Sequence, residues 1–395
     1  MLESDDPKKG LIPLPVRLIL TAEGVRLFSK NRTLVKTVKN KDGHARDGIE
    51  FSSYNANSVQ KLVMNAYLEE IYVCLPDLLS SRKYIIDTNS LVIYGNLYKK
   101  LSPSLATMVI KSKVVQDYNR KNPKNMLVDL DSVENKKLEI LRKTKQSDFE
   151  TMEMEITNDV VQKVINNPTL EEEDRLTRIK SLPKFMRYID PRIWYFYYII
   201  YQTQLKEEVR NSFSDMIIMY LDRTKLATHL SNLLMEFIQN AERSHFYKIL
   251  MDTPEKVGYR RDPEKFFKES ENRKWAIAEA KKRNQMLELS WNVNADHLGI
   301  GHSNKILISV THEGAIKDVD AKLMHQKMKS DTGGVPVSAF YKDSKQRSKV
   351  TNTELGLLYI SYIEEICRKE NIRFYCNLYS DQIKDKTTIR MEISL

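Results

Sequence analysis

Two polar residues, Glu236 and Asn240, interrupt an apolar helical segment at a spacing that places them on one face. The segment 226–241 carries leucine, phenylalanine and isoleucine at helical intervals, which predicts a strongly amphipathic helix. Residues four positions apart lie one above the other on a helix, so the carboxylate and the carboxamide are neighbours. Such a pair alone usually faces solvent, and any chemistry it performs depends on the elements that follow it.

A strand that runs directly into a glycine-containing turn comes later in the chain. Residues 287–293 alternate in polarity and residues 305–310 are almost continuously apolar, which predicts an antiparallel hairpin. The second strand continues into VTHEG, residues 310–314. After a long loop, NTELGL at residues 352–357 opens another predicted helix, and two strands between residues 372 and 395 close the chain.

In this order the elements resemble the ATP-binding domain of the GHKL family, which includes gyrase, heat-shock chaperones, sensor histidine kinases, mismatch-repair proteins and anti-sigma serine kinases. The family's N-box, a helix with Asn-Ala near its end, matches NLLMEFIQNA at residues 232–241. Its first glycine box, Val-x-Asp-x-Gly, matches residues 310–314, and its second, Gly-x-Gly-Leu-Gly-Leu, matches residues 352–357. The final strand, entered by Gly-Thr in the family, matches residues 386–387. The resemblance implies an α/β sandwich over residues 222–395.

The resemblance also implies roles for individual residues. Asn240 takes the position of the family's Mg²⁺ ligand, where an amide oxygen is a hard ligand for a hard ion. Glu236 stands where ATPase and anti-sigma members keep a general base, and Arg243 stands where a basic residue contacts phosphate. ATP and Mg²⁺ are therefore the implied cofactors. The matching positions of the two glycine boxes, which bind the nucleotide in the family, are His312, Gly314 and Gly356.

Two departures from the family pattern bear on nucleotide binding. The first-box aspartate, which reads the adenine amino group in the family, is His312 here, and a neutral imidazole accepts a hydrogen bond less strongly than a carboxylate does. The second box keeps Gly356 but has Asn352 and Glu354 in place of its earlier glycines. Glu354 adds like-charge repulsion against a triphosphate. We therefore expect either weak binding of Mg-ATP or a fold retained without nucleotide.

The N-terminal part, residues 1–115, mixes helical and strand-like patterns and predicts a small α/β domain whose role stays open. Residues 57–74 carry apolar side chains at helical spacing. Short β-branched, aromatic and aliphatic runs predict strands at residues 16–21, 34–38, 84–86 and 91–94.

The middle part, residues 116–221, is charged and free of glycine, and it predicts a helical connector. Its aromatic stripe, residues 194–198, is typical of a helical core, with a homodimer seam as the alternative. Together the three parts predict an α/β (α+β) protein. Because no histidine occurs between His44 and His229, a standard histidine autokinase with its phospho-acceptor before the ATP domain is not expected.

Composition and charge exclude several other classes. The twelve glycines are about half the average usage, and the Walker, G-x-G-x-x-G and H-E-x-x-H patterns do not occur. No apolar run is long enough to span a membrane. The N-terminus lacks an apolar signal core and the three cysteines suit a reducing compartment, so we expect a cytoplasmic protein. The net charge of +10 is interspersed with acidic residues, which does not favour a nucleic-acid partner.

Two function classes follow. The first is a cytoplasmic signal-transduction protein whose degenerate GHKL-type domain binds Mg-ATP weakly and acts on a protein partner, as a protein kinase or an ATPase. The second is a non-catalytic protein-interaction module that keeps the fold without nucleotide. A nucleic-acid-associated ATPase ranks below both, since the chain stops on its last strand with no transducer domain. The sequence leaves the signal, the partner and the oligomeric state open.

Overall fold

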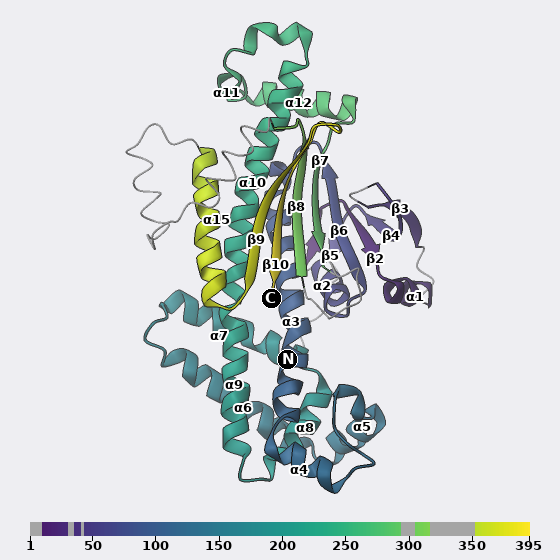
Figure 1. Ribbon diagram of the computed structural model, residues 1–395, viewed down its shortest axis with the longest axis vertical. Helices are drawn as coiled ribbons and strands as arrows, with labels where there is room; N and C mark the ends of the chain where they lie inside the picture. Colours follow the sequence, from purple (N-terminus) through teal and green to yellow (C-terminus); the bar gives the residue numbers. More distant parts are fainter. Residues whose placement is uncertain (1–9, 31–34, 41–42, 294–304, 317–351) are drawn as a thin grey trace. The chain divides into compact units, whose positions relative to one another are not determined.

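The computed structural model describes residues 10–30, 35–40, 43–293, 305–316 and 352–395 (Figure 1). The chain divides into two compact units. Unit 1 comprises residues 1–93 and 226–395, and unit 2 comprises residues 94–225. The division falls inside helix α3 (Arg82–Ile110) and near the start of helix α10 (Thr224–Met251). Unit 1 is thus built from two stretches that are distant in sequence.

An antiparallel sheet, eight-stranded within the described residues, forms the centre of unit 1. Its strand order is β3-β4-β2-β6-β7-β8-β10-β9, and a separate small sheet pairs β1 with β5. The strands are β1 (Leu11–Ile12), β2 (Val16–Leu20), β3 (Lys36–Lys39), β4 (Ala45–Phe51), β5 (Tyr54–Asn55), β6 (Leu68–Leu75), β7 (Leu287–Asn292), β8 (Lys305–Glu313), β9 (Arg373–Asp381) and β10 (Lys386–Ser394).

The two stretches of unit 1 meet where β6 pairs with β7. Ile71 lies opposite Trp291 and Val73 lies opposite Leu289, and all four side chains are buried. The sequence predicts separate domains at residues 1–115 and 222–395, whereas in the structure their strands share one sheet. The physical reason is that the apolar face of β6 continues across β7, so one core serves both stretches.

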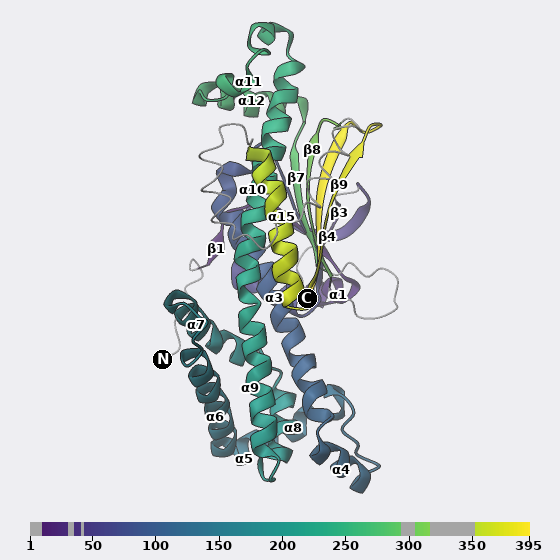
Figure 2. The ribbon, with the colours of Figure 1, turned by 60° about the vertical axis from the view of Figure 1, so that its left-hand side comes forward.

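Helices α10 and α15 (Asn352–Lys369) lie side by side on one face of this sheet (Figures 1 and 2). His229 Nδ1 of α10 is 3.1 Å from the Tyr359 hydroxyl of α15. Ile360 and Ile363 of α15 are buried. This arrangement confirms the predicted α/β fold class. The other helices of unit 1 are α1 (Ala22–Lys30), α2 (Ala56–Met64), the 3₁₀ turns η1 (Leu79–Ser81) and η3 (Pro254–Tyr259), α11 (Pro263–Phe266) and α12 (Ser270–Arg283).

Two N-terminal elements differ from the prediction. Residues 84–86 and 91–94, predicted as strands, belong to the long helix α3. Ile85, Val92 and Ile93 are completely buried there, so these apolar runs reflect burial on several sides of a helix. Residues 57–74, predicted as one helix, contain all of α2 except its first residue, then a turn at Ala66 with a φ of 57°, and most of strand β6.

Unit 2 is helical, and the aromatic stripe of helix α8 (Pro191–Tyr201) belongs to its core. Trp194, Phe196 and Tyr197 are at most 2% exposed. The ring of Phe213 lies 5.4 Å from Trp194 and 5.6 Å from Tyr197, measured between centroids. These rings are buried within one chain, which agrees with the core interpretation, while a homodimer stays a prediction. The further elements of this unit are α4 (Lys113–Lys121), η2 (Leu130–Ser132), α5 (Asn135–Thr144), α6 (Gln146–Ile165), α7 (Glu172–Tyr188), α8 (Pro191–Tyr201) and α9 (Lys206–Asp222).

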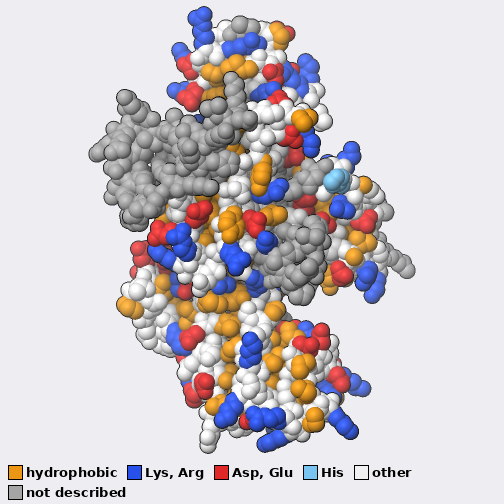
Figure 3. All heavy atoms as spheres, viewed as in Figure 1, with side chains coloured by type: hydrophobic (Ala, Val, Ile, Leu, Met, Phe, Trp, Pro, Cys, Tyr) orange, Lys and Arg blue, Asp and Glu red, His pale blue; other side chains and the backbone are white. Residues whose placement is uncertain are grey.

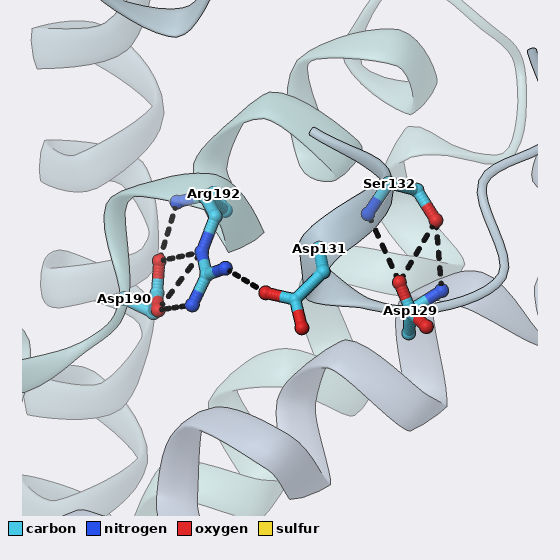
Figure 4. Close-up of polar contacts among 5 residues, drawn as sticks. All are labelled: Asp129, Asp131, Ser132, Asp190 and Arg192. Carbon is cyan, nitrogen blue, oxygen red and sulfur yellow. Dashed lines mark hydrogen bonds and ion pairs between the residues drawn. The ribbon is translucent and has the colours of Figure 1, made fainter. Parts of the chain in front are cut away.

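Arg192 ties the start of α8 to η2 (Figure 4). Its guanidinium donates to the carboxylate of Asp190, the N-cap of α8, and its Nη1 donates to Asp131 Oδ1 at 2.6 Å. Asp129 in turn accepts a hydrogen bond from the Ser132 backbone N–H at 2.9 Å and caps η2. These contacts fix where α8 begins and therefore which rings face the core of unit 2.

Candidate functional site

Glu236 and Asn240 lie on one face of α10, as their spacing predicts. Both side chains are half-buried, whereas Leu233, Leu234 and Phe237 of the same helix are buried. Within the described part of the chain, the Asn240 amide makes no hydrogen bond. Its oxygen is therefore available as a ligand.

Two arginines influence the carboxylate of Glu236. Burial raises the pKa of Glu236, while Arg82 and Arg243 act in the opposite direction. Arg243 lies almost two turns further along α10, and Arg82 is the first residue of α3. Sequence reasoning identified Arg243 but missed Arg82, because only the fold brings the start of α3 to this part of α10. A carboxylate with a raised pKa is a better proton acceptor, as a general base requires.

The turn after β8 adopts a backbone conformation that favours glycine. Gly314 has a φ of 99°, which side chains with a Cβ rarely adopt. Its backbone N–H donates to the Asp385 carbonyl at 2.7 Å, and its carbonyl accepts from the Thr387 hydroxyl at 2.7 Å. Lys248 of α10 pairs with Asp385 at 2.8 Å. The turn is therefore held by both α10 and the start of β10.

His312 lies at the end of β8, directly across from Thr387 in the register with β10. Its Nδ1 is 2.8 Å from the Glu313 carbonyl oxygen. Because a carbonyl can only accept, Nδ1 carries the proton and Nε2 of the neutral ring is an acceptor. Burial lowers the pKa of His312, which favours this neutral form. An acceptor at this position could receive a hydrogen bond from an amine.

A second histidine, His245 of α10, neighbours His312 and was not identified from the sequence. It is completely buried, and the Gln285 backbone beside its ring acts against the effect of burial on its pKa. Burial, and then the proximity of His312, lower the pKa of His245 to about 4. The sequence offered only its position shortly after Asn240, since its neighbour His312 lies on a strand far along the chain.

The site residues predicted from the sequence, together with His245, thus form two groups on different sides of α10. Glu236, Asn240 and Arg243 lie toward one side of the helix. Glu236 and His245 are about two and a half turns apart, so His245 and the neighbouring His312 are on the opposite side from Glu236. Residues 310–314 and the start of β10 are brought together through Gly314 and Thr387, while Gly356 lies within α15. The hairpin turn at 294–304 and the loop at 317–351 lie outside the described residues.

Charged side chains of both signs are interspersed over the face of the molecule seen in Figure 3, as they are in the sequence.

Among the helices that the structure describes, none is long and apolar enough to cross a membrane. The same residues contain no group of three or more His, Cys, Asp or Glu side chains suited to a metal ion.

Comparison with known proteins gives a family but no activity. A family of unknown function, DUF8084, matches residues 7–395. An uncharacterized protein of Treponema pallidum (strain Nichols) is 24% identical over 394 residues, which cover 98% of each chain. No solved structure matches. Because the family match extends over nearly the whole sequence, the chain belongs to the DUF8084 family of unknown function.

Proposed function

We propose that the chain binds Mg-ATP weakly through a degenerate GHKL-type domain and acts in signal transduction on a protein partner. The observation that carries the proposal is the turn at Gly314. A glycine with a left-handed backbone follows β8 and is hydrogen-bonded to Thr387, which lies across from His312. The first glycine box and the final-strand threonine, matched separately in the sequence, are thus neighbours. Their contact supports the resemblance more than either motif does alone.

The side chains on α10 fit a magnesium-bound nucleotide. The Asn240 amide oxygen is a hard ligand, is half-exposed and is not engaged by another described residue. Arg243 adds a positive charge beside it, suited to phosphate. Bound Mg-ATP would supply the phosphoryl group. Glu236, whose pKa is raised by burial, would accept the proton of the attacking hydroxyl or water.

A protein-interaction module without nucleotide is the second candidate function. Two observations favour it. His312 is only 4% exposed, and its neighbour His245 lies on the opposite side of α10 from Glu236 and Asn240. A side chain that reads a nucleobase must reach the ligand, and a closed, partly apolar environment opposes this. The two candidates therefore differ in whether the His312 side becomes accessible to adenine.

Calorimetric titration with millimolar Mg-ATP tests the proposal. We expect weak binding that Asn240→Ala reduces at least about tenfold, because a metal ligand is lost. Asn232→Ala, at an exposed position on the same helix, is the matched control and should bind like the wild type. Glu236→Gln should bind nucleotide normally but lose any hydrolysis or transfer.

His312→Asp restores the family residue and separates the two candidates. Tighter binding in this variant would support a retained adenine site. If neither the wild type nor a folded His312→Asp variant binds Mg-ATP, the nucleotide proposal is wrong and the interaction module is favoured. Circular dichroism of each variant checks that the fold is intact.

A further inference from the structure

A separate cavity of about 380 Å³ lies in unit 1, lined by residues of α10, η1, α11 and α12 and of the segment that follows α11. Figure 1 shows α11 and α12 close to the last turns of α10. The volume falls within the range of small-molecule sites. None of the residues assigned to the nucleotide except Arg243 lines this cavity.

Three aromatic rings form one wall of the cavity. The ring of Phe267 lies 5.8 Å from Phe246 and 5.9 Å from Tyr247, and it is stacked on Tyr247 with an interplanar angle of 14°. Phe246 is buried in the core, while Tyr247 and Phe267 are only partly covered. A flat apolar ligand can therefore lie against this wall by stacking or edge contact.

The polar part of the cavity contains Glu242, which is only 1% exposed. Its Oε2 accepts from the Leu79 backbone N–H at 3.2 Å, and its other oxygen contacts Arg273. Arg273 also donates to Asp77 at 3.0 Å, so the guanidinium is already balanced by a carboxylate. Burial and the adjoining Asp77 raise the pKa of Glu242 to about 8. Near neutral pH the polar part of the cavity therefore carries little net negative charge.

Two cations at the cavity lack such a partner. Among the described residues, neither Arg243 nor Lys268 forms an ion pair, and Glu236, the carboxylate on which Arg243 acts from a distance, does not line the cavity. The one other acidic group lining the cavity, Glu264, is exposed, where water and salt screen its charge. Available positive charge thus stands beside an aromatic wall.

We propose that this cavity binds a small aromatic anion, with its ring against Phe246, Tyr247 and Phe267 and its anionic group at Arg243 and Lys268. The proposal does not depend on nucleotide binding. It goes beyond the proposed function by assigning a second ligand to the same unit.

Three probes with the same ring system and different charge test the proposal. Naphthalene-2-carboxylate, naphthalene-2-methanol and naphthalen-2-ylmethylammonium are titrated into the full chain without nucleotide or magnesium, with calorimetry as the readout. We expect the carboxylate to bind at least about fivefold more tightly than the alcohol, and the ammonium to bind most weakly. Lys268→Gln should weaken carboxylate binding about fivefold and leave alcohol binding unchanged.

Lys274→Gln is the control, because Lys274 is exposed on α12 and does not line the cavity. Equal affinity for all three probes would overturn the proposal and indicate apolar contact only. Tighter binding of the ammonium would overturn the proposal and indicate an acidic site. Absence of binding by all three probes at millimolar concentration would also overturn it. If Lys268→Gln does not change the affinity for the carboxylate probe, Arg243→Gln is measured next. An unchanged affinity in that variant too would mean that the carboxylate binds elsewhere, and it would overturn the proposal.

Discussion

Glu242 and His245, only three positions apart on α10, show how burial controls charge in unit 1. Burial and Asp77 raise the pKa of Glu242 to about 8, and burial with His312 lowers the pKa of His245 to about 4. In both cases the neutral form is favoured, because an ion removed from water is poorly solvated. Their effects on stability have opposite signs. Glu242 opposes folding as the pH rises, and His245 opposes it as the pH falls.

Replacing Glu242 by glutamine should make the protein less sensitive to alkaline pH. Between its ordinary value of 4.5 and about 8, the native state holds a proton that the unfolded state has lost. The free energy of unfolding of the wild type should therefore fall as pH rises through this window, by at most about 1.4 kcal/mol per pH unit from this group. Glutamine imitates the protonated acid and removes this slope.

Urea unfolding of wild type and Glu242→Gln at about pH 5.5 and about pH 8 measures the difference, which should grow in favour of the variant at the higher pH. Glu264→Gln, at an exposed position, is the control. Parallel pH profiles for wild type and Glu242→Gln would contradict the prediction.

Part of the candidate site could be predicted from residue spacing and part could not. The common face of Glu236 and Asn240 follows from helical geometry, because both belong to one element. Arg82 and His312 approach α10 from a helix and a strand far away in sequence. No local pattern encodes such neighbours, so the charge around Glu236 and the environment of His245 required the fold.

At the level of elements, secondary structure was predicted correctly where a sequence pattern was compatible with only one kind of element. The antiparallel pair predicted from residues 287–293 and 305–310 is present as β7 and β8, with Leu289 opposite Val310. The runs at residues 84–86 and 91–94 were ambiguous, because a short apolar run suits either a strand or a helix buried on several sides. Burial of α3 within unit 1 decided this in favour of the helix.

Gly314→Ala should destabilise the turn that joins β8 to β10. Alanine is strained at a φ of 99°, and its Cβ would approach Lys248 Cδ to 3.3 Å. We expect a loss of about 1–3 kcal/mol in the free energy of unfolding. Gly258→Ala is the control, because no atom lies within 4 Å of a Cβ there, and it should change stability little.

Urea unfolding followed by circular dichroism provides the measurement. A Gly314→Ala variant as stable as Gly258→Ala would mean that the turn relaxes without cost. It would also weaken the resemblance to a glycine box, since that box requires a fixed backbone.

On the scale of the whole molecule, unit 1 is held together by polar as well as apolar contacts between its two stretches. Asn89 of α3 is completely buried. Its Oδ1 accepts from the Trp291 indole N–H of β7 at 3.0 Å, and its amide donates to the Ser231 hydroxyl of α10 at 2.9 Å. One N-terminal side chain therefore satisfies two buried groups of the C-terminal stretch. Such a contact ties the stability of the two stretches together.

Asn89→Ala should therefore destabilise both stretches of unit 1 to the same extent. The variant leaves the Trp291 N–H buried without an acceptor and removes packed atoms, so we expect a loss of about 2–4 kcal/mol. Lys83→Ala, an exposed position on the same helix, is the control. Native-state hydrogen exchange measures the opening free energy separately for β2 and for β10, and both should fall by similar amounts because they belong to one sheet. If only one of the two strands responds, residues 1–93 and 226–395 open independently and the separate domains suggested by the sequence would be restored.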